Sequence, residues 1–122
     1  MTEQDFFGLA RQGFNRIPLV HELPGDLETP LSVYLKLANA PYSYLLESVV
    51  GGERFGRYSF IGLPARTVLR VRAHLLTVET DGKVVEEYSL PDPLTFIAEF
   101  QARFKAAPVA GLPRFTGGLA GY

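Results

Sequence analysis

The stretch that decides the fold is LLTVETDGKVVEEYSL, which runs from Leu75 to Leu90. It consists of two segments rich in branched residues that flank the dipeptide Asp81-Gly82. Aspartate and glycine tolerate the positive φ angles of a two-residue turn, and this dipeptide between two such segments is a strong signal for a β-hairpin. The sequence therefore predicts antiparallel strands at 75–80 and 83–90.

More strands are predicted before this hairpin, and one after it. The segments with strand-forming composition are 43–50, 58–61 and 66–74. In the last of these, Leu69, Val71 and Ala73 alternate with Arg70, Arg72 and His74, which predicts one face that is exposed to water or salt-bridged. Residues 16–23 predict an edge strand because Pro18 interrupts them. A glycine-punctuated apolar strand is predicted from Phe115 to Tyr122.

The helices are predicted near the two ends of this run of strands. Thr29-Pro30 and Asp92-Pro93 each combine an N-cap side chain with a proline at the first helical position. Helices should follow them to about Asn39 and Lys105, and a shorter helix is expected over 4–12. Helices that are segregated from the strands indicate the α+β class, here a mostly antiparallel sheet packed with a few helices.

Composition narrows the classes of function. The 122 residues are 47% hydrophobic and 20% charged, which is typical of one soluble globular domain. There is no cysteine, so disulfides and thiolate nucleophiles are excluded, and with only two histidines we expect no metal site. The net charge is −1 with acids and bases interspersed, so we expect no nucleic-acid partner. No apolar run approaches the ~18 residues of a membrane span, and the cytoplasm is the expected location.

No complete catalytic centre is expected in the chain. Ser48 lacks the Gly-x-Ser-x-Gly turn of a hydrolase nucleophile. Residues 51–56 contain three glycines but no Lys-Ser/Thr pair, and they lead into a strand, whereas a phosphate-binding loop leads into a helix. Glu79, Glu86 and Glu87 occupy hairpin positions that should face solvent.

An acid and an alcohol side by side in an apolar strand are the most unusual feature. Glu47 and Ser48 follow Leu45-Leu46, and Arg54 and Arg57 lie on the connection to the next strand. A carboxylate buried without a partner would be costly, so Glu47 should find a cation or hydrogen-bond donors. One interpretation is a structural ion pair of Glu47 with Arg54 or Arg57. The other is a pocket for a zwitterion, with apolar walls and opposite charges for its two ends.

Four stretches resemble the N-terminal region of anthranilate synthase component I. They are TPLSVYLKL (29–37), YLLES (44–48), GGERFGRYSFIG (51–62) and FTGGLAGY (115–122). The resemblance implies that residues 1–122 are the regulatory N-terminal domain, a truncated part of that family's larger two-layer fold. It also implies that the chorismate-binding domain, with the catalytic residues and Mg²⁺, lies beyond Tyr122. The closing stretch agrees, because it lacks a polar tail, and we expect the fold to continue.

The resemblance implies an enzyme of tryptophan biosynthesis as the parent protein. The family converts chorismate to anthranilate with ammonia from a glutamine amidotransferase partner, component II, and L-tryptophan inhibits it by feedback. The family's Leu-Leu-Glu-Ser element is one wall of the tryptophan site, and further residues align with other parts of that cavity. The tryptophan contacts implied for this chain are Pro30, Leu46, Glu47, Ser48, Arg57 and Tyr58. The chain alone should be inactive.

Two other functions stay open. Component I of aminodeoxychorismate synthase, in the folate pathway, resembles the same family and uses the same substrate. The second is a non-catalytic binding module in which Glu47 only forms a structural pair with an arginine.

Overall fold

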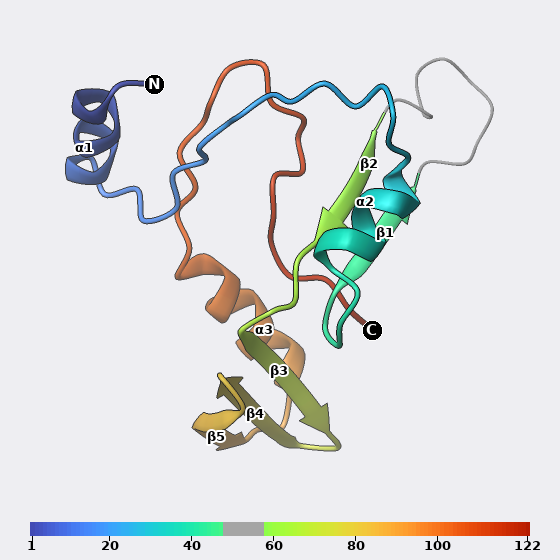
Figure 1. Ribbon diagram of the computed structural model, residues 1–122. Coiled ribbons are helices and arrows are strands. Elements are labelled where there is room, and N and C mark those ends of the chain that lie inside the picture. Colours follow the sequence, from blue (N-terminus) through green and yellow to red (C-terminus); the bar gives the residue numbers. More distant parts are fainter. Residues whose placement is uncertain (48–57) are drawn as a thin grey trace. The chain divides into compact units, whose positions relative to one another are not determined.

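The computed structural model describes residues 1–47 and 58–122. These residues form three helices and two antiparallel sheets, so the predicted α+β class is confirmed (Figure 1). In chain order the elements are α1 (Glu3–Arg11), α2 (Pro30–Leu37), β1 (Tyr44–Glu47), β2 (Ser59–Gly62), β3 (Thr67–Arg72), β4 (Leu75–Thr80), β5 (Lys83–Ser89) and α3 (Pro93–Ala102). The chain divides into two compact units, one built from 1–23 and 92–122 and the other from 24–91.

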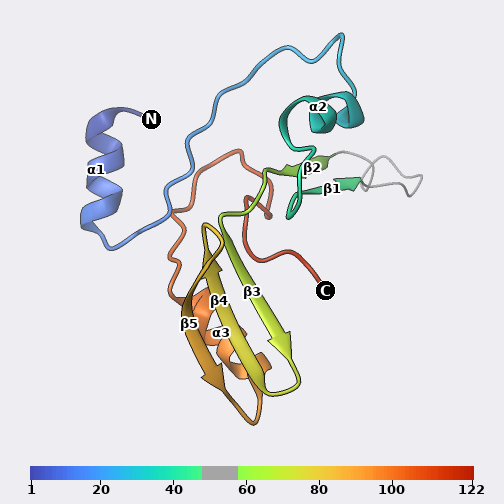
Figure 2. The same cartoon turned by 60° about the horizontal axis from the view of Figure 1, so that its bottom comes forward.

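The 24–91 unit contains a three-stranded sheet in the order β3-β4-β5, with β4 in the centre (Figure 2). Asp81 and Gly82 form the β4–β5 turn with φ angles of 52° and 79°. Both angles lie in the left-handed region that a tight hairpin turn requires, so the predicted hairpin is confirmed. Leu76 and Val78 on β4 are 0% and 2% exposed and supply the buried face of the sheet.

The opposite face of this sheet is polar, as the alternation in β3 predicted. Arg70 pairs in register with Thr77, and its Nε lies 3.4 Å from Glu79 Oε1. The strand is shorter than expected, because residues 73–74 make the turn into β4 and Ala73 has a φ of 54°. A left-handed residue cannot continue the strand, so β3 ends at Arg72.

The unit formed by 1–23 and 92–122 contains two capped helices. Thr2 and Asp5 form a reciprocal capping box at the start of α1. Asp92 accepts a hydrogen bond from Leu94 N at the start of α3. α3 ends three residues before the predicted Lys105, and α2 ends at Leu37, two residues before the predicted Asn39. The predicted starting signals of α2 and α3 are thus confirmed, and their ends are less accurate.

Asn15 joins two segments of this unit that are distant in sequence. Its Nδ2 donates to Arg103 O at 2.7 Å, and its Oδ1 accepts from Lys105 N at 2.7 Å. The backbone of Arg16 adds two bonds, from its N–H to Lys105 O at 3.1 Å and from Ala107 N–H to its own carbonyl at 2.8 Å. The segment before residue 17 is therefore fastened to the segment that follows α3.

Two predicted strands are wrong. In 16–23, only Arg16 takes part in β structure, through a single parallel bridge to Ala106. Pro18 lacks an N–H and cannot donate to a ladder, and 17–23 form no strand. The stretch 115–122 is not a strand either, and Gly117, Gly118 and Gly121 have φ angles of 138°, 150° and 157°. Such angles are open to glycine and depart from the negative φ of a strand.

Candidate functional site

The start of α2 carries the first of the residues implied by the resemblance. Thr29 is the N-cap: its Oγ1 accepts from Ser32 N at 3.1 Å, and its own N–H donates to Ser32 Oγ at 2.8 Å. This reciprocal pair satisfies two backbone donors at the helix end. Pro30 follows at the first helical position, where its fixed φ suits the helix and its missing N–H costs nothing.

α2 is fastened to the segment that leads into β1. Tyr34 Oη lies 2.9 Å from Ser43 Oγ, and Ser43 Oγ donates to Ala40 O at 2.6 Å. Since the serine has one proton and gives it to the carbonyl, Tyr34 is the donor to Ser43. The helix lies beside both β1 and β2 (Figure 1). The sequence thus places a helix, with Pro30 at its first position, against a two-stranded sheet.

β1 and β2 form a short antiparallel pair that positions the next residues. Tyr44 faces Gly62, Leu46 faces Phe60 and Glu47 faces Ser59. The Tyr44 ring covers Gly62 so closely that a Cβ built on this glycine would lie 2.1 Å from a ring carbon. A residue with a side chain would fit there only if the Tyr44 ring or the strand moved.

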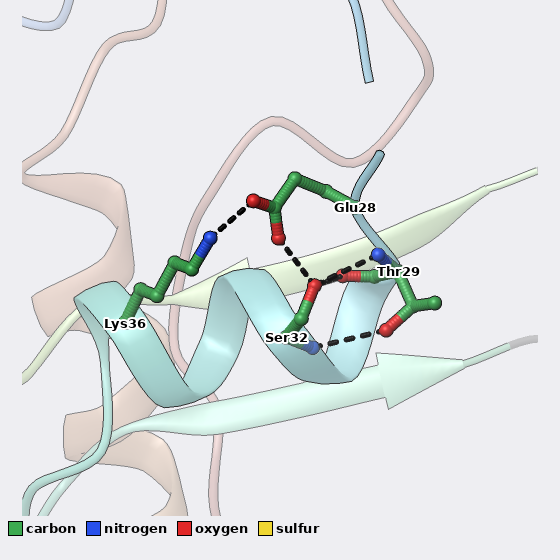
Figure 3. Close-up of polar contacts among 4 residues, drawn as sticks. All are labelled: Glu28, Thr29, Ser32 and Lys36. Carbon is green, nitrogen blue, oxygen red and sulfur yellow. Dashed lines mark hydrogen bonds and ion pairs between the residues drawn. The ribbon is translucent and has the colours of Figure 1, made fainter. Parts of the chain in front are cut away.

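Four of the six implied tryptophan contacts lie in the described residues, and all four are at the surface. Leu46 is 47% exposed and Tyr58 is 45% exposed, and Pro30 and Glu47 are also exposed. The N-terminal end of α2, the last residues of β1 and the start of β2 lie at the same end of this helix-and-hairpin assembly (Figures 1 and 3). The elements that carry these four residues are therefore brought together.

The Glu47 side chain, which would need a partner if it were buried, is exposed in this structure. Glu47 is the last residue of β1 and its side chain is exposed, because the strand's burial decreases toward that end. The cost of an unpaired buried carboxylate therefore does not arise, and Glu47 has no need of an internal cation on that ground. Ser48, Arg57 and the alternative partner Arg54 lie outside the described residues.

The structure adds a polar chain beside Pro30 that the sequence interpretation missed. Glu28 Oε2 accepts from Ser32 Oγ at 2.5 Å, and Glu28 Oε1 pairs with Lys36 Nζ (Figure 3). The hydrogen bond from Lys36, followed by that from Ser32, lowers the pKa of Glu28. Ser32 and Lys36 are four residues apart in α2 and lie on one face of the helix, but Glu28 precedes the N-cap Thr29, so helical spacing did not predict its position.

A second polar cluster lies on the exposed face of β3 and β4. Arg70 hydrogen-bonds to Tyr42 Oη, its guanidinium carbon lies 5.3 Å from the centre of the Tyr42 ring, and it pairs with Glu79. The bond to Tyr42 and the charge of Glu79 raise the pKa of Arg70. Because these groups satisfy one another, the cluster joins the turn before β1 to the three-stranded sheet.

The described residues contain no group of three or more His, Asp or Glu side chains that could hold a metal ion. In the same part of the chain, no helix has the length and apolar character needed to cross a membrane.

Comparison with known proteins gives a consistent result. The chain is 57% identical over all 122 residues to anthranilate synthase component 1 of Pseudomonas aeruginosa, and 58% identical over the same length to that of Neisseria gonorrhoeae. Against anthranilate synthase component 1 of Aquifex aeolicus, the identity is 44% over 112 residues, or 91% of the chain. The chain spans 25%, 25% and 22% of the lengths of these three relatives.

No protein-family model matches the chain, and no solved structure is significantly similar to it. The full-length identity to curated proteins nevertheless decides the relationship. The resemblance expected from the four motif stretches is confirmed, and the chain is related over its whole length to the N-terminal quarter of anthranilate synthase component 1.

Proposed function

We propose that the chain is the regulatory N-terminal segment of an anthranilate synthase component 1. The observation that carries this proposal is the identity of 55–58% that extends over all 122 residues to several proteins of that name. Identity at this level spread over the whole chain argues for a shared role of the segment, whereas a local motif match would argue only for a shared structural element.

The parent protein, in this proposal, is a cytoplasmic enzyme that converts chorismate to anthranilate for tryptophan biosynthesis. A glutamine amidotransferase, component II, is its partner and supplies ammonia. Chorismate and Mg²⁺ bind in the part of the enzyme that follows the chain. The chain by itself should catalyse nothing.

We further propose that Pro30, Leu46, Glu47, Ser48, Arg57 and Tyr58 form one wall of an L-tryptophan site. The exposure of Leu46 and Tyr58, at 47% and 45%, supports this, because an apolar side chain at the surface is available to cover an indole ring. The exposed carboxylate of Glu47 is similarly available to the ammonium group of an amino acid. Leu46 and Glu47 lie on β1, and β1 packs beside α2, the helix that begins with Pro30.

Feedback inhibition through this wall requires a difference in affinity. L-tryptophan must bind the inactive arrangement of the enzyme more tightly than the active one, since equal affinities shift no population. A site with one wall on this segment and the others on the rest of the enzyme can have such a difference in affinity. Its closure around L-tryptophan then depends on how the segment and the rest of the enzyme are arranged.

The decisive variant is Ser48→Phe in the full-length enzyme. A phenyl ring in place of the hydroxyl should fill the effector site, so inhibition by L-tryptophan should disappear while anthranilate formation without tryptophan continues. Anthranilate fluorescence measured against tryptophan concentration gives both quantities. Unchanged inhibition in this variant would reject the assignment of the wall.

The product of the full-length enzyme separates this proposal from the folate-pathway alternative. Anthranilate is the ortho-substituted amine, and aminodeoxychorismate leads to the para isomer. Chromatography of the product formed from chorismate with an ammonium salt should give the ortho isomer. Absence of any reaction with chorismate would favour the non-catalytic binding module.

A further inference from the structure

We propose that the polar chain Glu28–Ser32–Lys36 is a positioning device that holds Pro30 in place for the effector (Figure 3). This inference rests on the proposed function, because it gives the three residues a part in the tryptophan response. It concerns residues that the resemblance did not single out.

Ser32 is the central residue of the Glu28–Ser32–Lys36 contacts. Its Oγ donates to Glu28 Oε2 at 2.5 Å and accepts from the Thr29 N–H at 2.8 Å. Thr29 O lies 3.0 Å away, but the hydroxyl has one proton and the shorter contact is with the charged carboxylate. One side chain thus fixes both residues that precede Pro30.

Pro30 is the first residue of α2, directly after Glu28 and the N-cap Thr29. Its ring fixes its own φ, so the direction in which it leaves the helix end follows the path of the backbone through residues 28 and 29. Glu28 is held from two sides: its N–H donates to Gly25 O at 3.1 Å, and its carboxylate pairs with Lys36, in the last turn of α2. The backbone segment that leads into α2 is therefore held both by the preceding turn and by the last turn of the helix.

The exposure of the Lys36–Glu28 ion pair indicates that it contributes more to the position of the backbone than to the stability of the fold. The side chain of Lys36 is 64% exposed and that of Glu28 is 32% exposed. An ion pair so open to water adds little to the free energy of unfolding. It does restrict the path of the backbone, and small displacements of a contact residue are enough to weaken binding of a rigid ligand.

The test uses the full-length enzyme and compares L-tryptophan inhibition with substrate kinetics. Glu28→Ala and Lys36→Met should raise the tryptophan concentration for half-inhibition by about fivefold or more, a change larger than any in KM for chorismate. Ser32→Ala should do the same, and Ser32→Thr, which keeps the hydroxyl, should retain most of the wild-type response. Glu22→Ala removes an exposed carboxylate outside this chain of contacts and serves as the charge control.

The outcomes separate this inference from the function on which it rests. If the wild type is inhibited and the Glu28 and Lys36 variants respond like it, the positioning role is refuted and the tryptophan wall stands. A wild type that L-tryptophan does not inhibit refutes both. Equal loss of response in Ser32→Ala and Ser32→Thr would refute the role of the hydroxyl. Melting temperatures of all variants within a few degrees of the wild type exclude unfolding as the cause of a change.

Discussion

At the scale of single residues, Gly62 has the least room for an added Cβ among the glycines that the structure describes. A Cβ on Gly62 would lie 2.1 Å from the Tyr44 ring, whereas a Cβ on Gly8, inside α1, would meet no atom within 4 Å. Gly62→Ala should lower the free energy of unfolding by about 1–3 kcal/mol, because the ring or the strand must move. Gly8→Ala should raise it by about 0.5–1 kcal/mol through helix propensity. Urea denaturation followed by circular dichroism measures both, and effects of the same sign would contradict this reading.

Asp81 gives a residue-scale prediction about pH. Arg66 donates to its two oxygens at 3.0 and 2.9 Å, and these hydrogen bonds lower the pKa of Asp81. A carboxyl whose pKa is lower in the folded state stabilises the fold at pH values above its pKa in the unfolded state, which is about 3.9. This stabilisation is lost as the pH falls through the pKa of the folded state.

The replacement Asp81→Asn isolates this contribution, because asparagine also tolerates the left-handed φ of 52° at this position. The variant should be less stable than the wild type at pH 7, and the difference should shrink below about pH 4. Urea midpoints at pH 7 and pH 3 measure it. In about 1 M salt the difference at pH 7 should also become smaller, since the pair is exposed. A difference independent of both pH and salt would assign the effect to the turn alone.

At the scale of elements, the features that depend on adjacent residues could be predicted from the sequence. The pairing of segments that are distant in sequence could not. The β4–β5 hairpin and the starts of α2 and α3 follow from adjacent residues: Asp81-Gly82, Thr29-Pro30 and Asp92-Pro93. Residues 16–23 and 115–122 have strand-like composition, but a strand needs a partner, and composition does not provide one. The limits of an element are also set by its neighbours, as with Ala73, whose turn ends β3.

Asn15 supports a prediction at this scale, because its side chain connects two segments. Asn15→Ala removes both the bond to Arg103 O and the bond from Lys105 N, and should lower the free energy of unfolding by about 1–2 kcal/mol. Asn15→Asp keeps the acceptor for Lys105 N but loses the donor to Arg103 O, so its effect should be intermediate. Urea denaturation of the two variants measures the order, and two variants as stable as the wild type would show that the connection contributes nothing.

At the scale of the whole molecule, the sequence located the candidate site only through its likeness to known enzymes. Composition around Glu47 favoured a structural ion pair over a zwitterion pocket but did not decide between them, because burial is a property of the folded chain. In the structure Leu46, Glu47 and Tyr58 lie at the surface, so the argument that a buried Glu47 needs a partner does not apply. The contacts of Glu28 with Ser32 and Lys36 could not be predicted from spacing, because Glu28 precedes the helix and only the fold brings its carboxylate to them.

The division into units also has a consequence for how the protein is made. Residues 24–91 form one unit from a single uninterrupted stretch of sequence. All of this stretch is synthesised before residues 92–122, which the other unit needs to pair with residues 1–23. Asn15 and Arg103 are 88 residues apart, so at about 5–20 residues per second the N-terminal segment waits several seconds for its partner. During translation the inner stretch should therefore fold first, and the first 23 residues should be the part of the nascent chain that chaperones encounter unpaired.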